Sequence, residues 1–85
     1  MEKVVINFIN MRDQENVELE IPNNITANDL IVSLNRIYDL QMDVENIFNC
    51  YLVSEDPIAF IHGNKLLNEF GIRNGSKIIY QNKTV

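Results

Sequence analysis

The sequence has few of the residue types that most catalytic and metal sites use. It contains one cysteine, one histidine and no tryptophan, and its three glycines and two prolines exclude a collagen-like or low-complexity chain. A single cysteine cannot form an intramolecular disulfide, which favours a reducing compartment. No run approaches the roughly 18 apolar residues that span a bilayer, and the start shows no secretory signal pattern. We therefore expect a cytoplasmic protein without membrane insertion.

Acidic residues outnumber basic ones, by twelve to seven, and give a net charge of −5. A surface of this sign does not neutralise phosphates, so nucleic-acid binding is disfavoured. The balance changes along the chain, because residues 1–56 carry eleven acidic and three basic side chains whereas residues 57–85 carry one and four. This asymmetry either orients a partner electrostatically or is a chance split of solvated charge.

Length and hydrophobic content predict a single domain over residues 1–85, with a short tail at 81–85. A chain of 85 residues rarely holds two independent cores, and 46% hydrophobic residues is typical of a globular protein. The usual per-residue figure gives such a domain a free energy of unfolding of about 4–13 kcal/mol.

The first half of the chain predicts a hairpin followed by a helix. Residues 3–9 and 17–21 alternate with a period of two, which is typical of strands with one wet face. Pro22 ends the second strand, and the Thr26 to Asp29 spacing fits a helix N-cap. The expected helix buries one apolar stripe against the hairpin: Leu30, Ile31, Leu34, Ile37 and Tyr38.

The second half predicts three more strands. An acidic connector is followed by a β-rich run at 47–53, a breaker at 54–57 and a short apolar strand at 58–61. A helical turn at 66–70 ends at Gly71, and a tight turn at 73–76 precedes the last strand at 77–81. The order ββαββ-turn-β predicts an α+β protein with the β-grasp architecture, a mixed sheet of four or five strands packed on one helix.

The hairpin, the capped helix and the terminal segment LNEFGIRNGSKIIY (67–80) together resemble the ubiquitin-like superfamily over nearly the whole chain. The free-standing length, the acidic connector and the ending Leu-x-x-x-Gly-Ile-x-x-Gly-x-x-Ile are similar to the small bacterial YukD/EsaB-type proteins of type VII (Ess) secretion systems. Ser76 departs from that pattern, which usually carries an acid there.

The resemblance implies a non-enzymatic accessory or regulatory protein that docks on protein components of a type VII secretion machinery. Two alternatives remain: a ubiquitin-like carrier, or a regulatory β-grasp domain excised from a larger protein. Carriers end in a flexible Gly-Gly, whereas residues 81–85 read Gln-Asn-Lys-Thr-Val. We therefore expect a non-conjugating protein.

Residues capable of catalysis or metal binding do not form a recognisable motif. His62 follows a short strand and lies in an expected turn. Cys50 lies on the same face of its expected strand as apolar residues, so we expect its thiol to be buried. Asp39, Asp43 and Glu45 lack the glycine and the terminal glutamate of a calcium-binding loop. We expect no catalytic residue, no cofactor and no metal.

A binding surface is better supported than a catalytic site. Alternation places Val5, Ile9, Tyr51, Val53 and Ile79 on the sheet face away from the helix, and adjacent first and last strands would merge some of them into one patch. Ubiquitin-like folds commonly bind partners through this face, which implies Tyr51 and Ile79 as apolar anchors with Lys77 and Arg73 at the rim. The alternatives are that loops cover the patch, that these are ordinary strand residues, or that the patch forms a homodimer.

This interpretation predicts the effect of alanine at the two anchors. Tyr51→Ala or Ile79→Ala should weaken capture of a partner while the thermal midpoint stays within a few degrees. A large fall in the thermal midpoint would place the substituted residue in the core.

Overall fold

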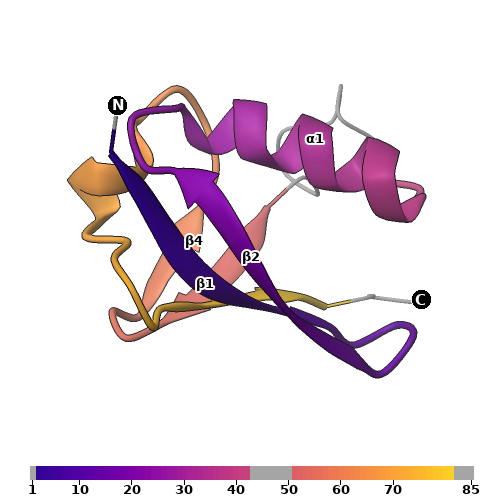
Figure 1. Cartoon of the computed structure of the whole chain (residues 1–85). Helices are drawn as coiled ribbons and strands as arrows, with labels where there is room; N and C mark the ends of the chain where they lie inside the picture. The colour runs from indigo at the N-terminus through magenta and orange to yellow at the C-terminus, as the bar shows by residue number, and fades with distance from the viewer. Residues whose placement is uncertain (1, 43–50, 82–85) are drawn as a thin grey trace.

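The computed structural model describes residues 2–42 and 51–81 (Figure 1). Its elements, in chain order, are β1 (Lys3–Asn10), β2 (Glu15–Pro22), α1 (Ala27–Tyr38), β3 (Leu52–Glu55), β4 (Ala59–Ile61), the 3-10 helix η1 (Leu67–Phe70) and β5 (Lys77–Tyr80).

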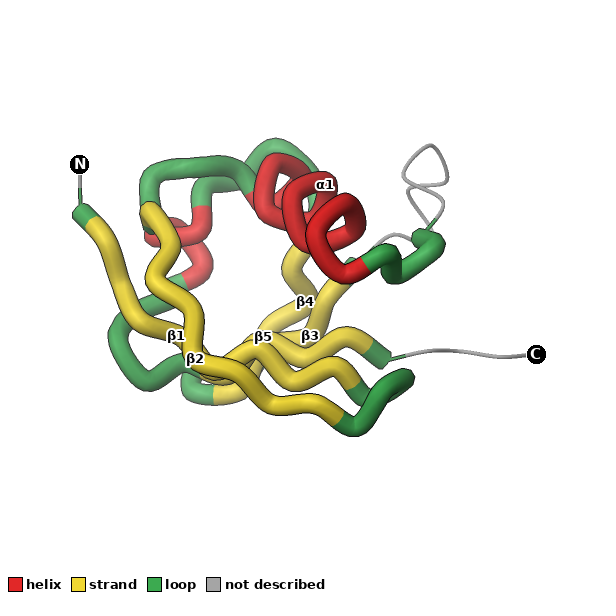
Figure 2. The backbone as a smooth tube through the Cα atoms, turned by 45° about the vertical axis from the view of Figure 1, so that its right-hand side comes forward, coloured by secondary structure: helices red, strands yellow, loops and turns green. Residues whose placement is uncertain are grey.

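The strands form one five-stranded mixed sheet in the order β2-β1-β5-β3-β4. The two outer pairs, β1–β2 and β3–β4, are antiparallel hairpins, and β5 pairs parallel to β1 and antiparallel to β3. The helix α1 lies over one face of the sheet (Figure 2). The predicted β-grasp architecture is therefore confirmed, including the adjacency of the first and last strands.

The core fills the space between α1 and the sheet. The predicted inward faces are confirmed, since Val4, Ile6 and Phe8 are each at most 7% exposed. Residues from every element contribute to the cluster, which also contains Ile21, Ala27, Leu30, Ile31, Leu34, Leu40, Leu52, Ile61, Leu67, Ile72, Ile78 and Tyr80. Burial of this apolar surface is the main favourable term in the stability of the fold.

The helix begins and ends where local chemistry favours it. The Thr26 hydroxyl accepts a hydrogen bond from the Asp29 N–H at 3.1 Å, as the N-cap pattern predicted. At the other end Asp39 adopts a left-handed conformation and donates its N–H to the Asn35 carbonyl. The predicted burial of Ile37 is wrong. Ile37 is 69% exposed, because it lies at the edge of the stripe beside β2, which is an edge strand in the described part of the sheet.

The predicted third strand needs a correction at its end. The run 54–57 was expected to break the strand, but β3 continues through Ser54 and Glu55. Ser54 is fully buried and its hydroxyl donates to the Pro57 carbonyl at 2.6 Å, so this polar side chain is satisfied inside the sheet. The start of the predicted strand, residues 47–50, lies outside the described residues.

The turn before β5 is held by Ser76. Its hydroxyl donates to the Asp56 carbonyl at 2.8 Å and accepts from the Arg73 N–H at 3.0 Å. Gly75 has a φ of +90°, a conformation that other residues rarely adopt, which explains the glycine in this predicted turn. The pattern that this segment resembles usually carries an acid at position 76. Here the residue is Ser76, and its buried hydroxyl joins this turn to the β3–β4 turn.

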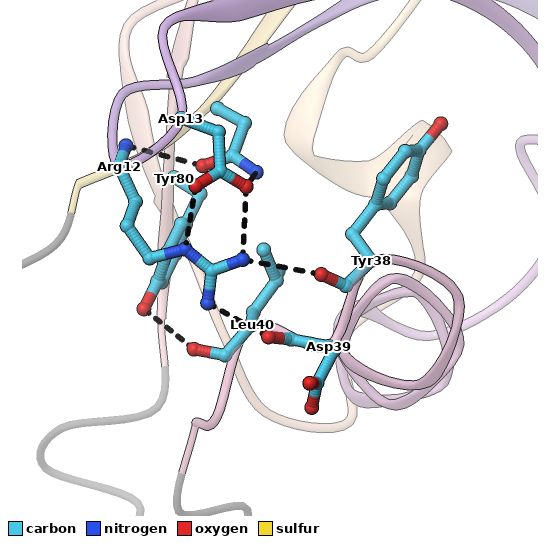
Figure 3. Close-up of polar contacts among 7 residues, drawn as sticks. Arg12, Asp13, Tyr38, Asp39, Leu40 and Tyr80 are labelled. Atoms are coloured by element: carbon cyan, nitrogen blue, oxygen red, sulfur yellow. Dashed lines mark hydrogen bonds and ion pairs between the residues drawn. The ribbon is translucent and has the colours of Figure 1, made fainter.

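Arg12 ties the β1–β2 turn to the end of α1 (Figure 3). Its guanidinium donates to the carbonyls of Asp39 at 2.7 Å and Tyr38 at 3.2 Å, and it pairs with the Asp13 carboxylate at 2.9 Å. A cation at a helix C-terminus is favourable because the last carbonyls carry partial negative charge. The Tyr80 hydroxyl donates to the Leu40 carbonyl at 3.0 Å and closes the same corner.

The contact between Arg12 and Asp13 gives the fold a pH dependence. The hydrogen bond from Arg12 lowers the pKa of the Asp13 carboxyl below its ordinary value of 3.8. A carboxyl with a lowered pKa stabilises the fold above its unfolded pKa, and the contribution is lost as pH falls through the folded value. We expect Asp13→Asn to lower the thermal midpoint by a few degrees at neutral pH, and the difference from the wild type to shrink below about pH 4.

Thermal melts of wild type and variant across this range measure the effect. Glu15→Gln, which neutralises another exposed carboxylate of the same hairpin, is the control. An unchanged difference between wild type and Asp13→Asn at acidic pH would contradict the assignment.

Candidate functional site

An apolar row crosses the sheet on the face away from α1. The strand register places Phe60 of β4 opposite Val53 of β3, Val53 opposite Ile79 of β5, and Ile79 opposite Ile9 of β1. Side chains on paired positions share one face, so four strands contribute to one continuous strip. Together with Tyr51, which packs on Phe60, we call these five residues the sheet patch.

The aromatic end of the sheet patch is its most exposed part. Phe60 is 65% exposed, and its ring meets the Tyr51 ring edge-on with centroids 5.6 Å apart. Ile58, directly before β4, is 87% exposed. An edge-on aromatic pair holds both rings in a defined orientation, which reduces the entropy lost when a partner packs on them.

Ile79 lies on the predicted face but is not an exposed anchor. It is only 7% exposed, and it stands on a central strand between Val53 and Ile9. The expectation that Ile79 presents its side chain to a partner is therefore wrong, because branched neighbours on both flanking strands cover it. Tyr51 is partly exposed at the margin of the same face, as predicted.

The two predicted rim cations are both exposed. Lys77 sits one row from Ile79 on the same face of β5, opposite Asn7 of β1 and Glu55 of β3. Arg73 lies in the turn before β5, with its N–H on the Ser76 hydroxyl. The structure thus brings Tyr51, Ile79 and Lys77 onto one face and places Arg73 in the adjoining turn.

Sequence reasoning missed Phe60 as the most exposed large side chain of the sheet patch. The run 58–61 is continuously apolar, so it does not reveal which side faces outward. The tight β3–β4 connection was a usable signal, because pairing Leu52 with Ile61 forces Phe60 onto the face of Val53.

Of the residues weighed for catalysis and metal binding, the structure describes His62 and Asp39. His62 is exposed just after β4, and Asp39 is exposed at the end of α1; Cys50, Asp43 and Glu45 lie outside the described residues. Within residues 2–42 and 51–81, no group of three or more His, Cys, Asp or Glu side chains is placed to hold a metal ion. Across the same described part of the chain, no helix has the length and hydropathy to cross a membrane.

Comparison with known proteins shows the fold. A ubiquitin-like domain from Arabidopsis thaliana superposes with a TM-score of 0.70 at 14% identity, covering 100% of this chain and 82% of that one. The ubiquitin of Caldiarchaeum subterraneum gives 0.68 at 14% identity, covering 99% and 98%. The ubiquitin-like domain of the Mycobacterium tuberculosis type VII secretion system protein EccD1 gives 0.55 at 15% identity, covering 93% and 97%. The sequence matches no family profile and no curated protein.

These superpositions establish that the chain has a ubiquitin-like β-grasp fold. Their identities are too low to transfer a function, so the function has to be argued from the surface.

The burial difference between Ile79 and Phe60 predicts opposite effects of alanine on stability. Ile79→Ala should cost about 2 kcal/mol or more and lower the thermal midpoint by about 10 °C, because it removes nearly buried methyl groups from a central strand. Phe60→Ala should cost less than about 1 kcal/mol, because most of its ring faces solvent. Chemical denaturation of both variants measures the loss in the free energy of unfolding. Equal losses would mean that Phe60 belongs to the core.

Proposed function

We propose that this protein is a non-enzymatic ubiquitin-like accessory or regulatory protein of a type VII secretion system that acts by docking on other proteins. The observation that carries the docking role is the sheet patch with its exposed aromatic end. Large apolar side chains that gather on one face of a small domain usually mark a partner site. The ubiquitin-like domain of EccD1, a protein of such a system, has the same fold, which supports the choice of machinery.

The residues of the sheet patch have distinct roles in this proposal. The exposed ring of Phe60 and the partly exposed ring of Tyr51 are the anchors, because aromatic side chains are enriched among the residues that contribute most to protein interfaces. Ile79 is the buried centre of the sheet patch and pairs with Val53 of β3. Lys77 and Arg73 act at the rim, where charges mainly influence the rate of association and its salt dependence.

The proposal also agrees with the way the surface is built. The patch is built on paired strands rather than on loops, and the Ser76 hydroxyl joins the turn that carries Arg73 to the β3–β4 turn beside Ile58. A surface that is ordered before binding loses less entropy when the partner arrives. Docking of this kind requires no bond making or breaking.

Affinity capture of the tagged full-length protein from cytoplasm and solubilised membranes of its own cells, with crosslinking and mass spectrometry, tests this function. We expect secretion-system components in the capture, with crosslinks at Lys77. Phe60→Ala or Tyr51→Ala should lower the affinity for the captured component by about tenfold or more. Lys77→Ala should change it by only a few-fold.

Met11→Ala is the matched control, because Met11 is an exposed apolar residue of similar exposure in the β1–β2 turn, outside the sheet patch. Capture that survives Phe60→Ala but is lost with Met11→Ala would reject the sheet patch. Recovery of an activating enzyme with a C-terminally modified bait would reject the docking role in favour of a carrier.

A further inference from the structure

A second surface lies on the other side of the hairpin, between β2 and α1. The two elements flank a groove of about 550 Å³. Most of its lining is apolar and comes from Leu19 and Ile21 of β2, Ile25 of the following loop, and Val32 and Ile37 of α1. Val32 and Ile37 are 42% and 69% exposed, so this groove presents hydrophobic side chains to solvent.

The strand that forms one wall of the groove is an edge of the sheet. β2 pairs with β1 and, among residues 2–42 and 51–81, has no partner strand on its other side. Every second residue of such a strand directs its N–H and C=O away from the sheet. An extended segment laid along β2 would satisfy these groups, and every second side chain of that segment would enter the groove.

The charge of β2 indicates which side chains the added segment carries at the positions that do not enter the groove. On the face of β2 away from the core, Glu18 and Glu20 stand two residues apart and both are exposed. The Lys3 ammonium lies 3.8 Å from the Glu20 carboxylate, and both side chains are largely exposed, so this ion pair is weak. Glu20 also lines the groove, and Asp29 is the second carboxylate of its lining. A basic segment complements this strip, whereas an acidic one is repelled.

The same carboxylates argue against a second copy of this chain as the occupant. If two β2 strands paired antiparallel with Leu19 opposite Leu19, Glu18 of each copy would lie opposite Glu20 of the other. Such a pair would contain two contacts between like charges. Like charges directly opposite one another destabilise a strand pair. A homodimer that pairs two β2 edges in this register is therefore disfavoured; the homodimer that the sequence left open, through the sheet patch, is a different arrangement.

We propose that β2 and the adjoining groove bind an extended basic segment of a partner protein by strand addition. Alternate apolar side chains of that segment occupy the groove against Leu19 and Ile37, and the intervening Lys or Arg side chains lie beside Glu18 and Glu20. This surface is separate from the sheet patch, and the proposal does not rest on the secretion role.

The test uses the full-length protein, labelled with ¹⁵N, and the synthetic peptide Lys-Val-Lys-Ile-Lys-Val-Lys. We expect saturable shifts of the amide resonances of β2 and of the groove side of α1. Slower hydrogen exchange of the outward β2 amides should accompany them, because strand addition gives these groups partners. Two control peptides share the length: Glu-Val-Glu-Ile-Glu-Val-Glu reverses the charge, and Lys-Val-Lys-Pro-Lys-Val-Lys removes a backbone donor. Both should bind at least about threefold more weakly.

Variants assign the two components of the interaction. The double variant Glu18→Gln and Glu20→Gln should weaken the lysine peptide by at least about threefold, whereas Glu55→Gln with Glu69→Gln, an equal charge change outside the groove, should not. Ile37→Ser should weaken binding, and Ile58→Ser, at an exposed apolar site elsewhere, should not.

Three results would overturn the proposal. These are the absence of saturable shifts at millimolar peptide, equal affinity for the glutamate peptide, and shifts at β2 without added protection from exchange. Phe60→Ala separates the two surfaces: peptide binding that falls with this variant would place the peptide on the sheet patch instead.

Discussion

The parallel pairing of β1 with β5 is the constraint on which the other features of this protein depend. It joins segments about 70 residues apart in the chain through Asn7 N–H to the Ser76 carbonyl at 2.9 Å and Met11 N–H to the Tyr80 carbonyl at 3.0 Å. A parallel pair needs a long crossover, and here the crossover contains α1. Placing β5 at the centre gives the helix a sheet wide enough to bury its stripe, and it directs the hairpins outward to the two edges.

This arrangement gives the domain two surfaces of different character. The central strands align Ile9, Ile79 and Val53 across the outer face, which ends in the exposed ring of Phe60. The first hairpin leaves β2 at the edge beside α1, where an apolar groove meets a strip of carboxylates. One surface is an apolar row on paired strands, and the other is a strand edge with exposed carboxylates.

The sequence predicted much of the fold because local rules and burial agreed in most segments. The alternation in β1 and β2, the Thr26 cap and the glycine turn before β5 each follow from nearest-neighbour chemistry, and the structure has them where expected. Predictions failed where a residue's surroundings come from distant segments. Ser54 continues a strand because Pro57 accepts its hydroxyl, and Ile37 is exposed because β2 is an edge.

The candidate site shows the same division between features set by local sequence and features set by distant segments. By itself the sequence determined the element order, the inward faces of the first hairpin and the outward parity of Tyr51, Val53 and Ile79, because strand periodicity is a local property. Only the tertiary structure decided that Ile79 is covered, that Phe60 is the exposed ring, and that β2 borders a groove. Exposure depends on which strands lie on either side, and that order is set by the long-range β1–β5 pairing, which no short stretch of sequence encodes.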